Sequence, residues 1–183
     1  QFPPYVVYKD LSLDYLAWAG EQMGDDEMLV EFRHASWYEE DVRDEVLAFL
    51  EEQGMSLVVV DAPKVEAKNV PRTLLAVTGP TVYVRFHGRN EKTWNSRGGS
   101  AAERFDYLYS EDELREWVEP LRELAGQAQN AYAFFNNNNR SPGDGGYGGY
   151  VAQGAANAQM LSGLLAETPS AAERRSGRPE ALE

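Results

Sequence analysis

The sequence predicts an α/β fold in which parallel strands alternate with covering helices. Short runs of β-branched and aromatic residues alternate with longer segments of helical periodicity, the order of repeated strand, loop and helix units. Residues 55–63 include four consecutive apolar residues, a pattern typical of a strand covered on both faces. Polar residues stand where each expected strand ends, at the edge where α/β folds build their sites. The numbers of strands and helices alone do not separate an open sheet from a barrel.

The composition of the 183-residue chain is that of one globular domain with an acidic surface. Its net charge is −13, and no apolar run approaches the ~20 residues that cross a membrane, so we expect no membrane partner. The absence of Cys excludes thiolate metal sites and fits a cytoplasmic location. The acidic balance opposes binding to nucleic acid, whose phosphates it repels. The shortage of Lys relative to Arg fits either a halophile or a GC-rich genome, and nothing in the sequence defines an oligomeric state.

The first elements are expected to be a strand end, a helix and a second strand. Residues 1–4 are interpreted as the end of a strand, because the two prolines there cannot both lie inside a sheet. The spacing of apolar residues predicts a helix over residues 10–23, with Asp10 or Ser12 as its cap. Residues 28–33 follow as a strand whose polar side chains share one face.

The next segment repeats the helix and strand pattern. Residues 41–54 are expected to form a helix, with acidic residues in its first turn and Gly54 as its C-terminal stop. The apolar run within residues 55–63 is the buried strand. Residues 65–79 are expected to be irregular, with a weak helix.

Residues 81–90 form the stretch around which the chain is arranged, a strand over residues 81–85 that runs into a charged tip. An arginine and a histidine on the inward face at a strand end are costly to bury without partners, which makes this tip the first candidate for a site. Side chains alternate along a strand, so two sets are expected on opposite faces: Val82, Val84 and Phe86 on one, and Tyr83, Arg85 and His87 on the other.

An amphipathic helix is predicted over residues 110–128. Ser110 and Glu113 have the spacing of a capping box, and Pro120 is expected to kink or loosen the helix. Its buried stripe is predicted to consist of Leu114, Trp117, Val118, Leu121 and Leu124.

The last elements are a strand and a helix. Residues 131–135 are expected to be a buried strand with amides at its tip, followed by a glycine-rich loop at residues 140–154 with no assigned structure. Residues 155–166 are expected to form a helix. The composition of residues 168–183 predicts a disordered tail.

Six ordered blocks of the sequence resemble the motifs of the YecE-like family, also called the domain of unknown function 72 family. They are EFRHASW (31–37), VVVDAP (58–63), YVRFHGRN (83–90) with Trp94, FDYLYSEDEL (105–114), AFFNNN (133–138) and ANAQML (156–161). The resemblance covers residues 1–167, and six blocks in order are far more specific than one motif.

The resemblance implies a TIM-barrel type (β/α) fold whose biochemical activity is not established. On that template residues 1–167 hold strands four to eight and lack about the first three, so the chain would represent the C-terminal two-thirds of the family. Four or five strands cannot close an eight-stranded barrel. The chain is therefore expected to be a partial barrel, either a fragment or a half-barrel that needs a partner.

Carried onto that barrel, nine polar residues converge on one mouth at the carboxyl ends of the strands. We expect Glu31 or Asp61 to act as general base and His87 or His34 as general acid. Arg33 and Arg85 would clamp a phosphate or carboxylate. The predicted catalytic residues are Glu31, Asp61 and His87, and the predicted substrate-binding residues are Arg33, His34, Arg85, Arg89, Asn136 and Asn137.

Two functions fit this constellation. The first is acid/base chemistry on a small phosphorylated or carboxylated substrate, which makes a small-molecule anion the expected partner. The second is a ligand-binding or scaffold protein without turnover, in which the charged residues merely fill the barrel end. Glu31, Asp61 and His87 are compatible with a divalent metal, but a metal is not favoured and no other cofactor is indicated.

Overall fold

The computed structural model describes residues 1–183 except 66, 95–102, 104, 144–146 and 168–183. The disordered tail predicted for residues 168–183 lies outside the described residues.

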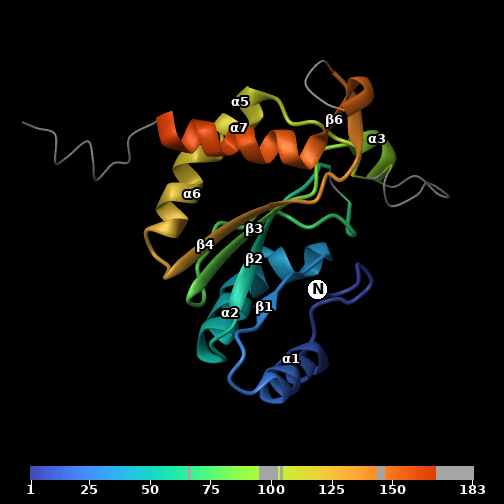
Figure 1. The fold of residues 1–183 in the computed structure, drawn as a ribbon. Coiled ribbons are helices and arrows are strands. Elements are labelled where there is room, and N and C mark those ends of the chain that lie inside the picture. The colour runs from blue at the N-terminus through green and yellow to red at the C-terminus, as the bar shows by residue number, and fades with distance from the viewer. Residues whose placement is uncertain (66, 95–102, 104, 144–146, 168–183) are drawn as a thin grey trace, which may run out of the picture.

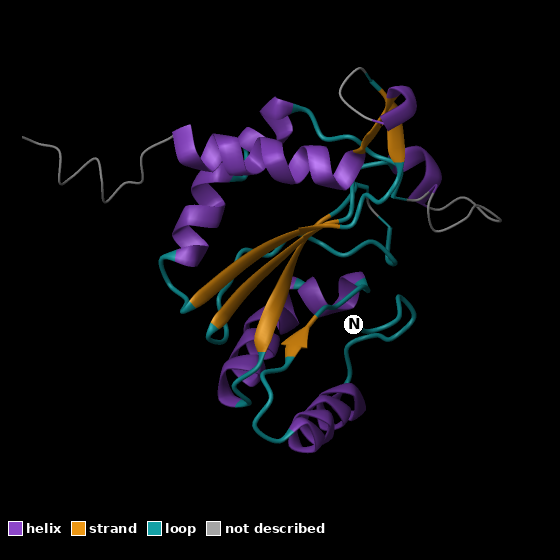
Figure 2. Cartoon of the chain, in the orientation of Figure 1, coloured by secondary structure: helices purple, strands orange, loops and turns teal. Residues whose placement is uncertain are grey.

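A four-stranded parallel sheet forms the centre of the fold (Figures 1 and 2). Its order along the sheet is the order of the sequence, and its strands are β1 (Leu29–Val30), β2 (Ser56–Asp61), β3 (Thr81–Phe86) and β4 (Asn130–Phe135). The predicted α/β class with parallel strands is confirmed. Within the described residues the sheet does not close into a barrel, so the TIM-barrel type is not confirmed.

Helices separate the strands of the four-stranded sheet along the chain, except between β2 and β3, where the described residues contain no helix. Figure 1 shows α5, α6 and α7 together beside β3 and β4, with α2 beside β1 and β2. Over the described residues the helices are α1 (Asp10–Met23), α2 (Glu40–Glu52), α3 (Glu91–Trp94), α5 (Glu111–Arg115), α6 (Val118–Ala125) and α7 (Gln153–Glu167), with 3-10 turns η1 (Ala35–Tyr38) and η2 (Tyr147–Gly149).

One face of the sheet packs against these helices. Leu57 and Val59 lie two residues apart on β2 and therefore point to the same side. Leu57 belongs to a buried cluster with Leu50 of α2, whereas Val59 belongs to one with Trp117 and with Leu161 of α7. Because both clusters meet β2 on the same side, α2, α6 and α7 all cover this face, which we call the helix face.

The other face, here the open face, is covered mainly near the carboxyl ends of the strands. There Val58 and Val60 pack with Val70 of the following loop and with Trp94 of α3. Further along the sheet, the aromatic side chains of β4 remain accessible, with Tyr132 51% and Phe134 49% exposed. This half-open face carries the candidate site described below.

The helix predicted over residues 110–128 is divided into α5 and α6. Pro120 has no N–H to donate to the carbonyl four residues before it, and the helix is interrupted at that point, near Trp117. The capping box of Ser110 and Glu113 is present, and all five residues of the predicted stripe are buried. The predicted loosening at Pro120 is confirmed.

Several other elements differ from expectation. Residues 1–4 are not a strand: Phe2 donates one main-chain hydrogen bond to Glu31 (3.0 Å), and the prolines that follow have no N–H with which to continue a ladder. The strand expected at residues 28–33 is reduced to β1. Neither Asp10 nor Ser12 caps α1, which begins after Lys9, because the Ser12 hydroxyl donates to the carbonyl of Val7 (3.0 Å).

Three further corrections concern residues beyond β2. The described part of residues 65–79 contains no helix, and the glycine-rich loop contains an antiparallel hairpin of β5 (Arg140–Pro142) and β6 (Tyr150–Ala152). The strand expected to be buried at residues 131–135 is largely exposed, because β4 pairs only with β3 among the described strands.

Candidate functional site

A cavity of about 390 Å³ opens on the open face of the sheet, beside the carboxyl ends of its strands. Glu31 directly follows β1, Arg85 comes from the end of β3, and Asn136 directly follows β4. These strands belong to one parallel sheet, in which β2 lies between β1 and β3, so their ends bring residues distant in sequence to one edge. The cavity is lined by Gln1, Leu29, Glu31, Val58, Tyr83, Arg85, Phe134, Phe135 and Asn136.

The Glu31 carboxylate is the centre of the charged groups at this cavity. One of its oxygens, Oε2, accepts from Arg85 in a close ion pair, and the other, Oε1, lies 3.2 Å from Nε2 of His87. Oε1 also accepts from the amide of Gln1 (2.6 Å) and lies 4.0 Å from Nε of Arg33. The structure therefore brings together Glu31, Arg33, Arg85 and His87, as expected. We call this group, with Asn136, the Glu31 cluster.

His87 is held between two pocket residues rather than facing the cavity itself. Its Nδ1 lies 3.1 Å from the amide nitrogen of Asn136, which donates, and its Nε2 faces Glu31. An N–H donor at Nδ1 and a carboxylate at Nε2 together select the neutral tautomer with hydrogen on Nε2. The ring is buried. His87 thus links Glu31 to Asn136 from behind the wall of the cavity.

Burial and neighbouring charges shift the pKa values of Glu31 and His87. Burial alone would raise the pKa of the Glu31 carboxyl, but the hydrogen bond from His87 and the guanidinium of Arg85 lower it to about 2. Burial lowers the pKa of His87 and outweighs the opposing effect of Glu31. At neutral pH the cluster therefore contains a carboxylate, a neutral imidazole and the Arg85 cation.

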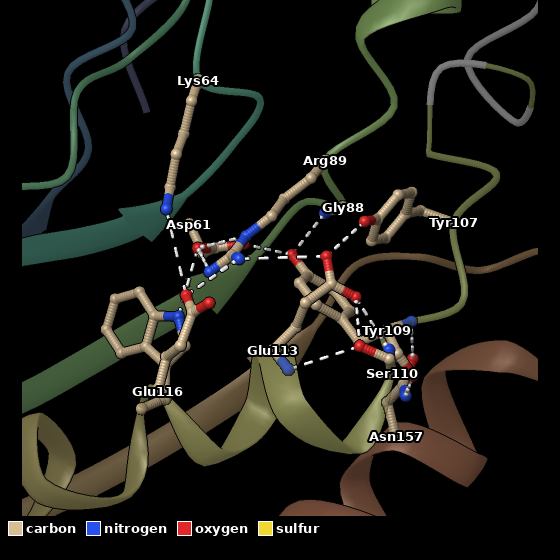
Figure 3. Close-up of polar contacts among 11 residues, drawn as sticks. Asp61, Lys64, Gly88, Arg89, Tyr107, Tyr109, Ser110, Glu113, Glu116 and Asn157 are labelled. Carbon is tan, nitrogen blue, oxygen red and sulfur yellow. Dashed lines mark hydrogen bonds and ion pairs between the residues drawn. The ribbon is translucent and has the colours of Figure 1, made fainter.

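Asp61 and Arg89 lie apart from this cluster. Asp61 shares the helix face with Val59, since the two are separated by two residues on β2. Its carboxylate accepts three hydrogen bonds from Arg89, at 2.8 to 3.1 Å, one from the Tyr109 hydroxyl (2.5 Å) and one from the Trp117 indole (3.1 Å) (Figure 3). These partners satisfy Asp61 within the protein, which favours a structural role over the predicted role of base.

The Asp61 network continues to the surface through Arg89. Arg89 also donates to Glu116 (3.0 Å), which lies 3.9 Å from the exposed Lys64, as Figure 3 shows. Burial would lower the pKa of the Arg89 guanidinium, but its bonds to Asp61 and Glu116 raise it. Burial and the Asp61 charge raise the pKa of Tyr109, so its hydroxyl stays a donor to Asp61. The arginine is therefore committed to protein carboxylates.

The remaining predicted residues also have protein partners. Asn137 is 0% exposed, and its amide donates to the carbonyl of Tyr107 (2.8 Å) and to the side chain of Asn157 (2.8 Å) on α7. His34 precedes η1, and its Nδ1 accepts from the N–H of Ser36 (3.2 Å). Both arrangements hold loops in place, so neither residue joins the Glu31 cluster.

Gly88 lies between His87 of the Glu31 cluster and Arg89 of the Asp61 network. Its replacement tests how closely Tyr107 packs against the main chain there. Its φ is +85°, and a Cβ at this position would lie 2.7 Å from the Cβ of Tyr107. We expect Gly88→Ala to destabilise the protein by more than the roughly 1–2 kcal/mol of a left-handed alanine alone. Gly54→Ala is the matched control in urea unfolding, since Gly54 has φ +65° with nothing within 4 Å of the added Cβ. Equal losses in the two variants would contradict the close approach of Tyr107.

A second, larger cavity of about 700 Å³ lies beside α1 and the N-terminal segment. Its walls are mostly apolar, including Phe2, Val6, Tyr15 and Trp18. Its charged lining residues are Lys9 and Asp14, and none of the predicted site residues lines it.

Neither a metal centre nor a membrane-crossing helix is found among the residues that the structure describes. In that part of the chain no three side chains of His, Asp or Glu gather closely enough to hold a metal ion. No described helix combines the length and apolarity needed to cross a bilayer.

Fold and site together define an α/β protein whose parallel sheet carries a charged pocket beside the carboxyl ends of its strands. The profile of a family described as "Protein of unknown function DUF72" matches residues 1–176. The chain therefore belongs to the DUF72 family, as the six sequence blocks predicted. The match extends beyond residue 167 and does not confirm that the chain is limited to the C-terminal two-thirds of the family.

Relatives with solved structures share both sequence and fold with this chain. A DUF72 family protein of Thermotoga maritima MSB8 is 36% identical with a TM-score of 0.73, over 91% of this chain and 56% of that one. A DUF72 family protein of Enterococcus faecalis V583 is 27% identical with a TM-score of 0.78, over 100% of this chain and 61% of that one.

UPF0759 protein YunF of Bacillus subtilis is 36% identical over 141 residues, which are 75% of this chain and 50% of YunF. The chain thus spans between 50% and 61% of the length of these three relatives.

Proposed function

We propose that the Glu31 cluster binds a small phosphorylated or carboxylated molecule and supports proton transfer to or from it. One observation carries the anion proposal: Arg85 lies on the cavity wall with its side chain 22% exposed, whereas the carboxylate that neutralises it is only 2% exposed. The accessible half of the buried ion pair is therefore the cation. A planar guanidinium with an open edge is well suited to phosphate or carboxylate.

The charge of the cluster supports the same proposal. Glu31 is ionised and His87 is neutral at neutral pH, so the charge that the cluster presents to a ligand in the cavity is the positive charge of Arg85. An anionic ligand would complement that charge.

Proton transfer would follow from competition for Arg85. A carboxylate with a pKa of about 2 is a weak base, because an efficient base has a pKa near the operating pH. An anionic group that takes hydrogen bonds from Arg85 would weaken the ion pair with Glu31 and raise the pKa of its carboxyl. In this proposal Glu31 becomes the base only when the substrate is bound.

Calorimetric titration of phosphate, sulfate and a small sugar phosphate into wild type and Arg85→Lys tests the anion site. Lys keeps the charge and loses the planar fork, so we expect anion binding to weaken about 10- to 150-fold, the value of a charged hydrogen bond. Arg43→Lys is the control, because Arg43 pairs with the exposed Asp44 away from the cavity. Absence of binding to wild type, together with a large loss of stability in Arg85→Lys, would show that the pair is structural. Binding without turnover of any ligand would favour the scaffold function.

We also infer that residues 1–167 are one domain of TIM-barrel type, with β1 to β4 as strands five to eight. The parallel sheet with helices on one face supports this, as does the accessible aromatic row on the open face. A crystal structure of the full-length protein would test the inference. A closed eight-stranded barrel is expected, and a sheet that stays open would contradict it.

The net charge of −13 leads to a prediction about salt. If the charge is a halophilic adaptation, molar KCl should raise the melting temperature, because salt screens self-repulsion. The melting temperature would be followed against KCl and against an osmotically matched neutral solute. An unchanged or falling value in KCl would leave genome composition as the explanation.

A further inference from the structure

We infer that the pocket of the Glu31 cluster selects anions that carry a hydroxyl group close to the charged group, with Asn136 as the residue that recognises the hydroxyl. This inference rests on the proposed function and gives its substrate class: small hydroxycarboxylates or hydroxyalkyl phosphates. The specificity follows from hydrogen bonds that orient the Asn136 amide.

The hydrogen bonds that orient the Asn136 amide begin at Glu31. Its ionised carboxylate only accepts hydrogen bonds, so Nε2 of His87, 3.2 Å away, must carry hydrogen. A neutral imidazole has one donor and one acceptor, which leaves Nδ1 of His87 as the acceptor. The NH₂ group of Asn136, 3.1 Å from Nδ1, is then the donor. A reversed amide would place oxygen against an unprotonated ring nitrogen, with two acceptors facing each other.

The imidazole is also fixed in place. It stacks on Phe105 with ring centroids 5.5 Å apart, and its edge meets Trp94 at 6.3 Å. The main-chain N–H groups of His87 and Asn136 donate to the carbonyls of Asp61 (2.9 Å) and Phe86 (2.8 Å). Ring and amide therefore have little freedom to exchange roles.

The consequence is a defined pattern of donors and acceptors around the cavity. One N–H of the Asn136 amide is committed to His87, which fixes the amide so that its oxygen is available as an acceptor, beside the second N–H, to a ligand in the cavity that Asn136 lines. Arg85 offers donors on the neighbouring strand, whose Phe86 pairs with Phe135 next to Asn136. A ligand that satisfies both needs an anionic acceptor and a hydroxyl donor a short distance apart. A plain carboxylate or phosphate could accept from the second N–H but has no donor for the amide oxygen, so it would make one hydrogen bond fewer to Asn136.

Matched ligand pairs test the inference by calorimetry on the full-length protein. The pairs are lactate with propionate and glycerol 3-phosphate with propyl phosphate. Wild type is expected to bind the hydroxylated member about 2- to 10-fold more tightly, the value of one neutral hydrogen bond. In Asn136→Ala the preference for the hydroxylated member of each pair should be lost. Asn138→Ala is the control, because Asn138 is the exposed amide two residues away.

The failure of this inference is separable from the failure of the proposed function. Equal binding of hydroxylated and unsubstituted anions to wild type, or a preference that persists in Asn136→Ala, would overturn the inference and leave the anion site intact. Absence of binding by every anion would overturn both. If Asn136→Ala does not fold, ¹⁵N NMR of His87 in wild type decides instead: protonated Nε2 with unprotonated Nδ1 is expected, and the opposite tautomer would remove the basis of the inference.

Discussion

Replacing Asp61 by Ala is expected to lower the free energy of unfolding by roughly 3–5 kcal/mol, the cost of breaking a buried ion pair by removing one partner. The variant would leave the guanidinium of Arg89, which is 11% exposed, without its main counter-ion. It would also leave the Tyr109 hydroxyl and the Trp117 indole without their acceptor. Such buried donors carry their full desolvation cost when left unsatisfied.

Urea unfolding of Asp61→Ala measures this loss. Lys64→Ala is the control at the same network, because Lys64 is 72% exposed and its ion pair with the half-exposed Glu116 is long, at 3.9 Å. We expect the control to change stability by less than about 1 kcal/mol. If Asp61→Ala also lost less than about 1 kcal/mol of stability, this would contradict the structural role and restore Asp61 as a candidate catalytic residue.

Glu31 is expected to stabilise the protein in a pH-dependent way. Its pKa is lowered from an ordinary value of about 4.3 to about 2 in the folded state, so its stabilisation is fully present above about pH 4.3 and is lost as the pH falls toward 2. A shift of this size corresponds to roughly 3 kcal/mol of stability. Glu31→Gln cannot titrate and should lose correspondingly less stability between pH 5 and pH 2 than wild type.

The measurement is denaturant unfolding of both proteins at pH 5 and pH 2. Glu40→Gln, which removes an exposed carboxylate from the first turn of α2, should follow the wild-type pH dependence. Parallel losses in wild type and Glu31→Gln would show that Arg85 and His87 do not lower the pKa of the Glu31 carboxyl in the folded protein.

Local patterns predicted most of the fold, because helices and buried strands have clear periodicities. The stripe of α5 and α6, the capping box at Ser110 and the stop at Gly54 were all readable from spacing. The exposure of β4 could not be predicted from spacing, since its sequence is equally apolar whether or not other parts of the protein cover it. The length of β1 was overestimated, because the alternating pattern continues through Glu31 although the strand ends at Val30. The Glu31 side chain lies in the Glu31 cluster.

The candidate site was predicted in part. Glu31, Arg33, Arg85 and His87 gather as expected because they come from the carboxyl ends of β1 and β3 in one parallel sheet. Asp61 was assigned to the same mouth, yet alternation from Val58 and Val60 on the open face already places it on the helix face. Its partners Tyr109 and Trp117 come from a loop and a helix junction far along the chain, so only the tertiary structure could show that Asp61 and Arg89 are satisfied within the protein.

Anomalous scattering from crystals soaked in selenate tests the central claim most directly, because it shows where an anion binds without assuming a reaction. We predict an anomalous peak in the cavity of the Glu31 cluster, with selenate oxygens within hydrogen-bonding distance of the Arg85 guanidinium. Peaks that occur only elsewhere on the protein, with the Arg85 side chain still paired to Glu31 alone, would contradict the account.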